Sequence, residues 1–156
     1  MSSESKIPEQ EWNRKFAASL FNWTWKLLEK KDRTQEEDEM IHAAHASSFH
    51  WGKVGTPVNF ARGDWPISRV YSVLKRPEPS LFHAQWCLDE CKKGEIGEFT
   101  LAFAYEALAR ASAVAGKMND CRRYIAEAKE AGEKIEEKED KNLLLSELKT
   151  APGYED

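Results

Sequence analysis

The regular spacing of large apolar residues limits the fold of this chain more than any other sequence feature. Across residues 9–31 such a residue recurs every three or four positions, namely Trp12, Phe16, Leu20, Trp23 and Leu27. This period places the side chains on one face of an α-helix. The alternating apolar and polar runs that indicate β-strands do not occur. We therefore expect an all-α protein whose first helix buries this face in the core.

Turn and capping residues divide the chain into about six or seven helices. With 156 residues, the chain is expected to form a single domain. We expect a first helical hairpin over 9–54, two further helix pairs over 57–138 and a short amphipathic capping helix over 141–149. Residues 1–8 are expected to be a disordered N-terminus, and residues 150–156 a frayed tail.

Two of the helix starts carry recognisable capping residues. Thr34 and Glu37 fit a capping box that begins the second helix. Thr56 followed by Pro57 is an N-cap with proline at the first helical position, which begins the third. Within that third helix Pro66 lacks the N–H that the helix needs. The helix therefore either kinks near Gly63 or ends there, with a new helix capped by Asp64.

Composition and charge are those of a soluble protein. Hydrophobic residues make up 41% of the chain and charged residues 32%. No segment approaches the roughly 20 apolar residues of a membrane span, and the start, MSSESKIPEQEW, lacks the features of a signal peptide. We expect a cytoplasmic protein without a membrane partner. The net charge of −4 also argues against nucleic-acid binding.

The three cysteines, Cys87, Cys91 and Cys121, predict buried thiols rather than a disulfide framework. Basic residues are concentrated between Lys53 and Arg76, where five of them face one acid, Asp64. This segment is positively charged although the whole chain is acidic, and its positive charge favours an acidic partner.

A repeated pattern occupies the second half of the chain. In AYEALARASAVAGKMNDCRRYIAEA, residues 104–128, Tyr105 stands before Leu108 and Ala109, and Gly116 lies in the following turn. A related segment, SRVYSVLKRPEPSLFHAQWCL, precedes it over residues 68–88. Together these segments resemble a divergent tetratricopeptide repeat (TPR), mainly over residues 64–130. The spacing from Lys75 to Gly116 is 41 residues, whereas the family period is about 34.

The resemblance implies antiparallel helical hairpins stacked as a short right-handed superhelix. Proteins of this family bind peptide segments in a concave groove lined by the first helix of each pair. In this register the groove-facing residues are Arg62, Trp65, Arg69 and Ser72 in one pair, and Phe103, Glu106, Arg110 and Ala113 in the next.

Arg69 and Arg110 occupy equivalent positions in successive repeats, since they are also 41 residues apart. Together with Arg62 and Asn59 they would form a bidentate cradle for a carboxylate. Phe21 and Trp25 on the first helix would add apolar pockets beside it. The alternative is that Glu106, four residues before Arg110, neutralises that arginine.

The histidines of the second helix suggest a different kind of site. Asp38, His42 and His45 share one helical face, with imidazole and carboxylate groups suited to zinc or iron. Histidines that bond to neighbouring groups in a packed interior explain the same pattern. The sequence contains no phosphate-binding loop, nucleophile elbow or paired CxxC motif.

Two functions follow from these patterns. The favoured one is a non-catalytic TPR-like module that binds an acidic peptide or C-terminal carboxylate through Asn59, Arg62, Trp65, Arg69 and Arg110, without a cofactor. The alternative is a small metal-dependent or anionic-ligand-binding enzyme that uses Asp38, His42 and His45. The aromatic residues of the first hairpin also allow a homodimer.

Overall fold

The computed structural model of the protein describes residues 8–32 and 36–156. Within these ranges the chain forms seven α-helices and no β-strand, which confirms the all-α prediction. The helices are α1 (Glu9–Glu29), α2 (Glu37–Val54), α3 (Pro57–Val73), α4 (Pro77–Gly94), α5 (Glu98–Val114), α6 (Met118–Glu133) and α7 (Lys138–Lys149). None of these helices is long and apolar enough to cross a membrane.

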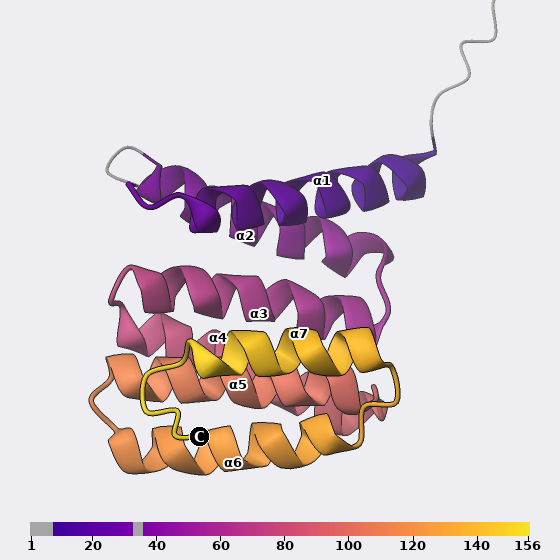
Figure 1. The fold of residues 1–156 in the computed structure, drawn as a ribbon. Helices are drawn as coiled ribbons and strands as arrows, with labels where there is room; N and C mark the ends of the chain where they lie inside the picture. The colour runs from indigo at the N-terminus through magenta and orange to yellow at the C-terminus, as the bar shows by residue number, and fades with distance from the viewer. Residues whose placement is uncertain (1–7, 33–35) are drawn as a thin grey trace, which may run out of the picture.

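The helices stack in chain order, and each packs against its neighbour (Figure 1). The pairs α1 and α2, α3 and α4, and α5 and α6 make the most extensive contacts, and α3 also packs on α5. The last helix, α7, returns along the stack and packs on α5 and α6. The first helices of the pairs and α7 therefore lie close enough to build one shared site.

Clusters of buried side chains hold the stack together, and two of them include buried residues of α3. One joins the first three helices through Leu27, Met40, Ala44, Ile67 and Val70. The other joins α3, α4 and α5 and consists mainly of alanine, leucine and cysteine. Small residues let the helices approach closely, as at Gly63, where an added Cβ would lie 3.0 Å from Ser48 Oγ on α2. A larger residue at position 63 would therefore push α2 away from α3.

The buried face of α1 differs from the predicted one. Leu27 is buried as expected. In contrast, Trp12, Phe16 and Trp23 are exposed, with exposed fractions of 38%, 49% and 39%. The other buried residues of α1 are Asn13, Ala17 and Thr24. Their small size brings α2 close enough for Ser47 Oγ to donate to the backbone oxygen of Ala17 at 2.7 Å. Close approach and hydrogen bonding of small side chains thus decide this interface, rather than the burial of large rings.

Helix α3 begins as the sequence predicts and is one continuous helix. Thr56 is its N-cap, Pro57 is its first residue, and the Thr56 backbone N–H donates to Asn59 Oδ1 at 3.0 Å. The helix then runs through Pro66 to Val73 without a restart at Asp64. Pro66 deprives one carbonyl of its helical partner, but the helix continues on both sides of it and Pro66 is buried. The predicted cap at Thr34 lies outside the described residues.

The C-terminal residues are packed rather than frayed. Ala151 is buried, and Tyr154 joins an apolar cluster between α5, α6 and α7. The Cys121 thiol donates to the backbone oxygen of Pro152 at 3.0 Å, and the Lys129 ammonium lies 4.4 Å from the centre of the Tyr154 ring. These contacts fix the segment after α7 and hence the position of α7 itself.

Candidate binding groove

A buried carboxylate, that of Glu106 on α5, organises the centre of the groove. Its side chain is completely buried. One oxygen, Oε1, accepts from Arg69 Nη1 at 3.0 Å and also from Arg110 Nε, while Oε2 accepts from the Trp65 indole at 2.9 Å. A buried charge is tolerated only when it is paired and fully hydrogen-bonded, and Glu106 meets both conditions.

Helix α7 completes this network from the other side. The Glu147 carboxylate pairs with Arg69 Nη2 at 3.1 Å. The backbone oxygen of Glu147 accepts from Arg110 Nη2 at 2.6 Å. Burial lowers the pKa of the Arg69 guanidinium, and the carboxylate of Glu106 opposes that shift. Both arginines are therefore engaged within the chain, chiefly by Glu106 and Glu147.

The predicted groove residues separate into three roles. Trp65, Arg69 and Arg110 come together around Glu106. Asn59 is used in the cap of α3, where it bonds to Thr56. Arg62 is exposed and lies beside an aromatic cavity rather than in the ion-pair network.

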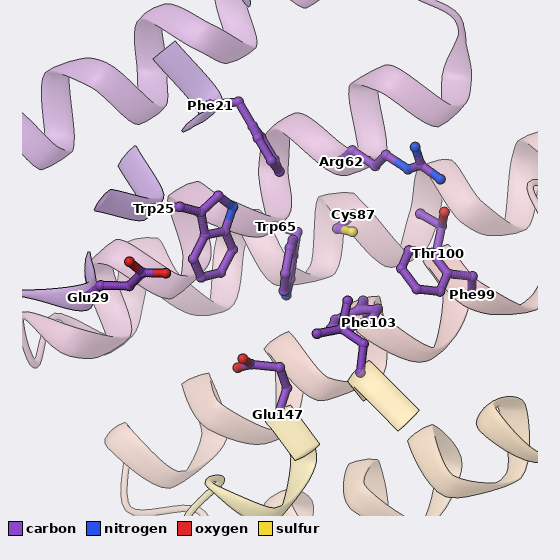
Figure 2. Close-up of a pocket in the computed structure, with 11 residues that line it drawn as sticks. Phe21, Trp25, Glu29, Arg62, Trp65, Cys87, Phe99, Thr100, Phe103 and Glu147 are labelled. Carbon is purple, nitrogen blue, oxygen red and sulfur yellow. The ribbon is translucent and has the colours of Figure 1, made fainter. Parts of the chain in front are cut away.

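That cavity lies between α1, α3, α5 and α7 and has a volume of about 380 Å³. Figure 2 shows aromatic rings on several sides of it, with arginine and glutamate side chains toward its ends. The lining residues are Phe21, Trp25, Glu29, Arg62, Trp65, Cys87, Phe99, Thr100, Phe103, Leu143 and Glu147. A concave, mainly apolar cavity with a few charged groups is the usual form of a ligand site.

The aromatic wall of the cavity is held in a fixed arrangement. Ring centres lie 5.0 Å apart for Trp25 and Trp65, and 4.7 Å apart for Trp65 and Phe103. The indole of Trp65 is fixed further by its bond to Glu106. Because these rings are held by contacts and a hydrogen bond, a ligand would meet a preformed surface and bind with little ordering cost.

Charge is distributed unevenly around this wall. The Arg62 guanidinium lies 5.8 Å from the centre of the Phe99 ring, and no carboxylate in the described part of the chain pairs with it. Glu29 and Glu147 lie away from Arg62, on the opposite side of the rings (Figure 2). The cavity thus offers one available cation at one end, which could bind an acidic group.

The predicted metal residues are not gathered into one site. Asp38 and His42 are exposed, whereas His45 turns inward and its Nε2 lies 2.9 Å from the Tyr71 hydroxyl. In residues 8–32 and 36–156 no three histidine, cysteine, aspartate or glutamate side chains are positioned to share a metal ion. His50 bonds to Asn13, and His83 bonds to Asp64.

Several cavity residues did not emerge from sequence reasoning. Phe99, Thr100, Leu143 and Glu147 lie outside the predicted site, although Phe103 and Trp65 were expected in the groove. The 41-residue repeat relates two residues that were expected in the groove, since Trp65 bonds to Glu106 and lies 41 residues from it. No comparable signal locates α7, because its docking position depends on tertiary packing.

Comparison with known proteins gives no assignment. No protein-family model matches this chain, and no curated protein or solved structure matches it either.

Proposed function

We propose that this protein is a non-catalytic, TPR-like interaction module that binds an acidic peptide. A large apolar side chain of the peptide enters the aromatic cavity, and a carboxylate of the same peptide pairs with Arg62. The observation that carries this proposal is the cavity of about 380 Å³, with a packed aromatic wall and, at its edge, a guanidinium that pairs with no carboxylate in residues 8–32 and 36–156.

The aromatic wall supports an apolar anchor. Aromatic side chains that are already packed against one another lose little freedom on binding, and they dominate the energetics of many interfaces. Trp25 and Trp65 come from different helices, so a ligand that lies against both rings would contact both α1 and α3. Such a contact suits a peptide that lies across the first helices of the stack.

Arg62 supports an acidic group beside that anchor. A guanidinium pairs with a carboxylate through two parallel hydrogen bonds. Arg69 and Arg110 are less suited to this task, because Glu106 and Glu147 already engage them. Their role in the proposal is to hold Trp65 and α7 in place.

Peptide selection tests the proposal. A display library of random peptides would be panned on the purified protein, and the selected peptides should combine a large apolar residue with a nearby Asp, Glu or free C-terminus. Arg62→Met should weaken their binding by about tenfold, since a charge-assisted pair is lost. Affinity should also fall as salt is raised.

A matched control is available on α6. Arg123 is an exposed arginine that stacks on Tyr124 and does not line the cavity. Arg123→Met should leave peptide binding unchanged. Equal binding by the Arg62 and Arg123 variants, or a selection without any common feature, would refute the proposal.

We also retain the cytoplasmic location as part of the proposal. The three cysteines are free and buried, which suits a reducing compartment. The enzyme alternative receives no such support, because Asp38, His42 and His45 do not converge.

A further inference from the structure

The end of the aromatic cavity at Arg62 holds several hydrogen-bond donors close together. Arg62 on α3 lines the cavity together with Phe99 and Thr100, the second and third residues of α5. The Arg62 guanidinium lies 5.8 Å from the centre of the Phe99 ring. Figure 2 shows the Thr100 hydroxyl on the same side of the cavity as that guanidinium. A charged side chain of α3 and the first turn of α5 therefore meet at this end.

The Thr100 hydroxyl is an enclosed polar group without a protein partner. Thr100 is only 5% exposed, and its hydroxyl makes no hydrogen bond with residues 8–32 or 36–156. Within the same residues every completely buried side-chain oxygen or nitrogen does have a partner. The Thr100 oxygen must therefore reach accessible surface, and Thr100 lines the cavity. This hydroxyl is thus available to a ligand that enters the cavity.

The start of α5 adds backbone donors at the same place. The first hydrogen bond of the helix runs from the Leu101 N–H to the Gly97 oxygen, so the N–H groups of residues 98–100 have no partner within the helix. No described side chain caps them, and the N-cap residue, Gly97, has no side chain that could. Such a helix start carries partial positive charge and attracts oxyanions. Glu98, the first residue of α5, is half-buried and does not line the cavity.

The acidic residues of the cavity lie elsewhere. Glu29 and Glu147 are on the opposite side of the aromatic rings from Arg62 (Figure 2). Glu147 is also engaged by Arg69 at 3.1 Å. An anion in the cavity is therefore directed to the end with Arg62 and Thr100.

The number of donors at this end favours a phosphate over a carboxylate. A carboxylate has two oxygens, and a guanidinium engages both of them in a bidentate pair. A phosphate monoester brings three terminal oxygens and about 1.5–2 negative charges at pH 7. Two of these oxygens can pair with Arg62 while the third accepts from the Thr100 hydroxyl, so each donor meets an oxygen of its own.

We propose that the acidic group bound at this end of the cavity is a phosphate, so that the partner is a phosphorylated peptide. The Arg62 guanidinium and the Thr100 hydroxyl donate to the phosphate, and the positive end of α5 stabilises its charge. An apolar residue beside the phosphorylated one enters the aromatic cavity. The inference rests on the function proposed above, since it names the acidic group of that peptide, and a carboxylate binds at the same place more weakly.

Synthetic peptide pools test this inference. Each pool has random flanking residues and one fixed central residue, which is phosphoserine, phosphotyrosine, glutamate or serine. The pools would be passed over the immobilised protein, and the retained peptides would be identified by mass spectrometry. The best phosphopeptide would then be titrated by fluorescence anisotropy beside the same peptide with glutamate at the central position. We expect the phosphopeptide to bind at least about tenfold more tightly.

The variants separate the two side-chain donors. Thr100→Val keeps the shape of the side chain and removes a hydroxyl that has no partner in the described part of the protein, so its stability in urea should be unchanged. It should weaken the phosphopeptide about fivefold and the glutamate peptide much less. Arg62→Met should weaken both peptides. Arg123→Met, outside the cavity, should leave both affinities unchanged.

The failure of this inference differs from the failure of the proposed function. Equal affinity for the phosphopeptide and the glutamate peptide, or an unchanged preference in Thr100→Val, would overturn the phosphate while peptide binding stands. Full phosphopeptide binding by Arg62→Met would overturn it too, because the phosphate would then lie elsewhere. Inorganic phosphate that binds as tightly as the phosphopeptide would show that the peptide contributes nothing. Retention of no pool would reject both proposals.

Discussion

Glu106 and Arg69 lie 37 residues apart in the sequence and form an ion pair of 3.0 Å at the centre of the groove. The pair joins α5 to α3, and Glu147 on α7 engages the same guanidinium at 3.1 Å. One buried carboxylate thus links three helices and also fixes Trp65 through its second oxygen. The aromatic wall of the cavity consequently depends on an ion-pair network whose central carboxylate, that of Glu106, does not line the cavity.

The first prediction concerns this buried carboxylate. Glu106→Gln removes the charge that compensates Arg69 and Arg110, and the new amide cannot accept from all three of its present donors. Breaking a buried ion pair at one partner typically costs about 3–5 kcal/mol. We expect the free energy of unfolding, measured by urea denaturation, to fall by an amount of this order.

Glu147→Gln is the matched control for that measurement. The Glu147 side chain is 30% exposed, and its contact with Arg110 includes the backbone oxygen, which the substitution retains. Its cost should therefore be clearly smaller. Equal losses for the two variants would mean that Glu106 has no special place in the network.

The second prediction concerns the docking of α7. Leu148 is completely buried in the cluster with Ala109, Cys121 and Ile125. Leu148→Ala should lower the free energy of unfolding by about 2–5 kcal/mol, because the truncation leaves a cavity. Leu143→Ala removes the same atoms from a side chain that is 49% exposed, so chemical denaturation should show a much smaller loss. Similar losses would contradict the observed docking of α7.

Local patterns in the sequence were sufficient for the helices but not for every interface. Thr56 and Pro57 begin α3 as predicted, because capping depends on residues close in the chain. The buried face of α1 was predicted wrongly, since Ala17 lies against α2 while Phe16 is largely exposed. A prediction from hydrophobicity alone misses this interface, because a small residue lets the two helices approach closely and form a hydrogen bond between them.

In the site, too, contacts between residues close in the sequence could be predicted, whereas contacts that depend on tertiary packing could not. The alternative in which Glu106 neutralises Arg110 could be read from their four-residue spacing, and the two side chains do pair. The contribution of Glu147 could not be read in this way, because it depends on where α7 docks. The peptide groove itself stays a prediction.

The third prediction concerns the thiols. Hydrogen bonding to Cys91 and burial raise the pKa of Cys87, and burial raises the pKa of Cys121, whereas the bond from Cys87 lowers the pKa of Cys91. Since the thiolate is the reactive form, a thiol reagent should label the native protein slowly and Cys91 first. All three cysteines should react rapidly in denaturant. Mass spectrometry of the labelled peptides gives the order, and early labelling of Cys121 would contradict it.

The last prediction concerns the dependence of stability on pH. Burial, and then the proximity of His83, lowers the pKa of His45 below its ordinary value of 6.5. The unfolded chain therefore binds a proton at this histidine more readily than the folded chain. Its contribution to stability is present above about pH 6.5 and is lost as the pH falls through the lowered pKa of the folded state.

Denaturation curves between about pH 8 and pH 5 would measure this contribution. His45→Gln should reduce the loss of stability on acidification, because the glutamine has no proton to gain in this range. His42→Gln changes an exposed histidine three residues earlier on the same helix, and it removes only the smallest of the contributions that lower the pKa of His45, so most of the loss should remain. An NMR titration would identify His45 directly by a midpoint below 6.5, and a midpoint above that value would contradict the argument from burial.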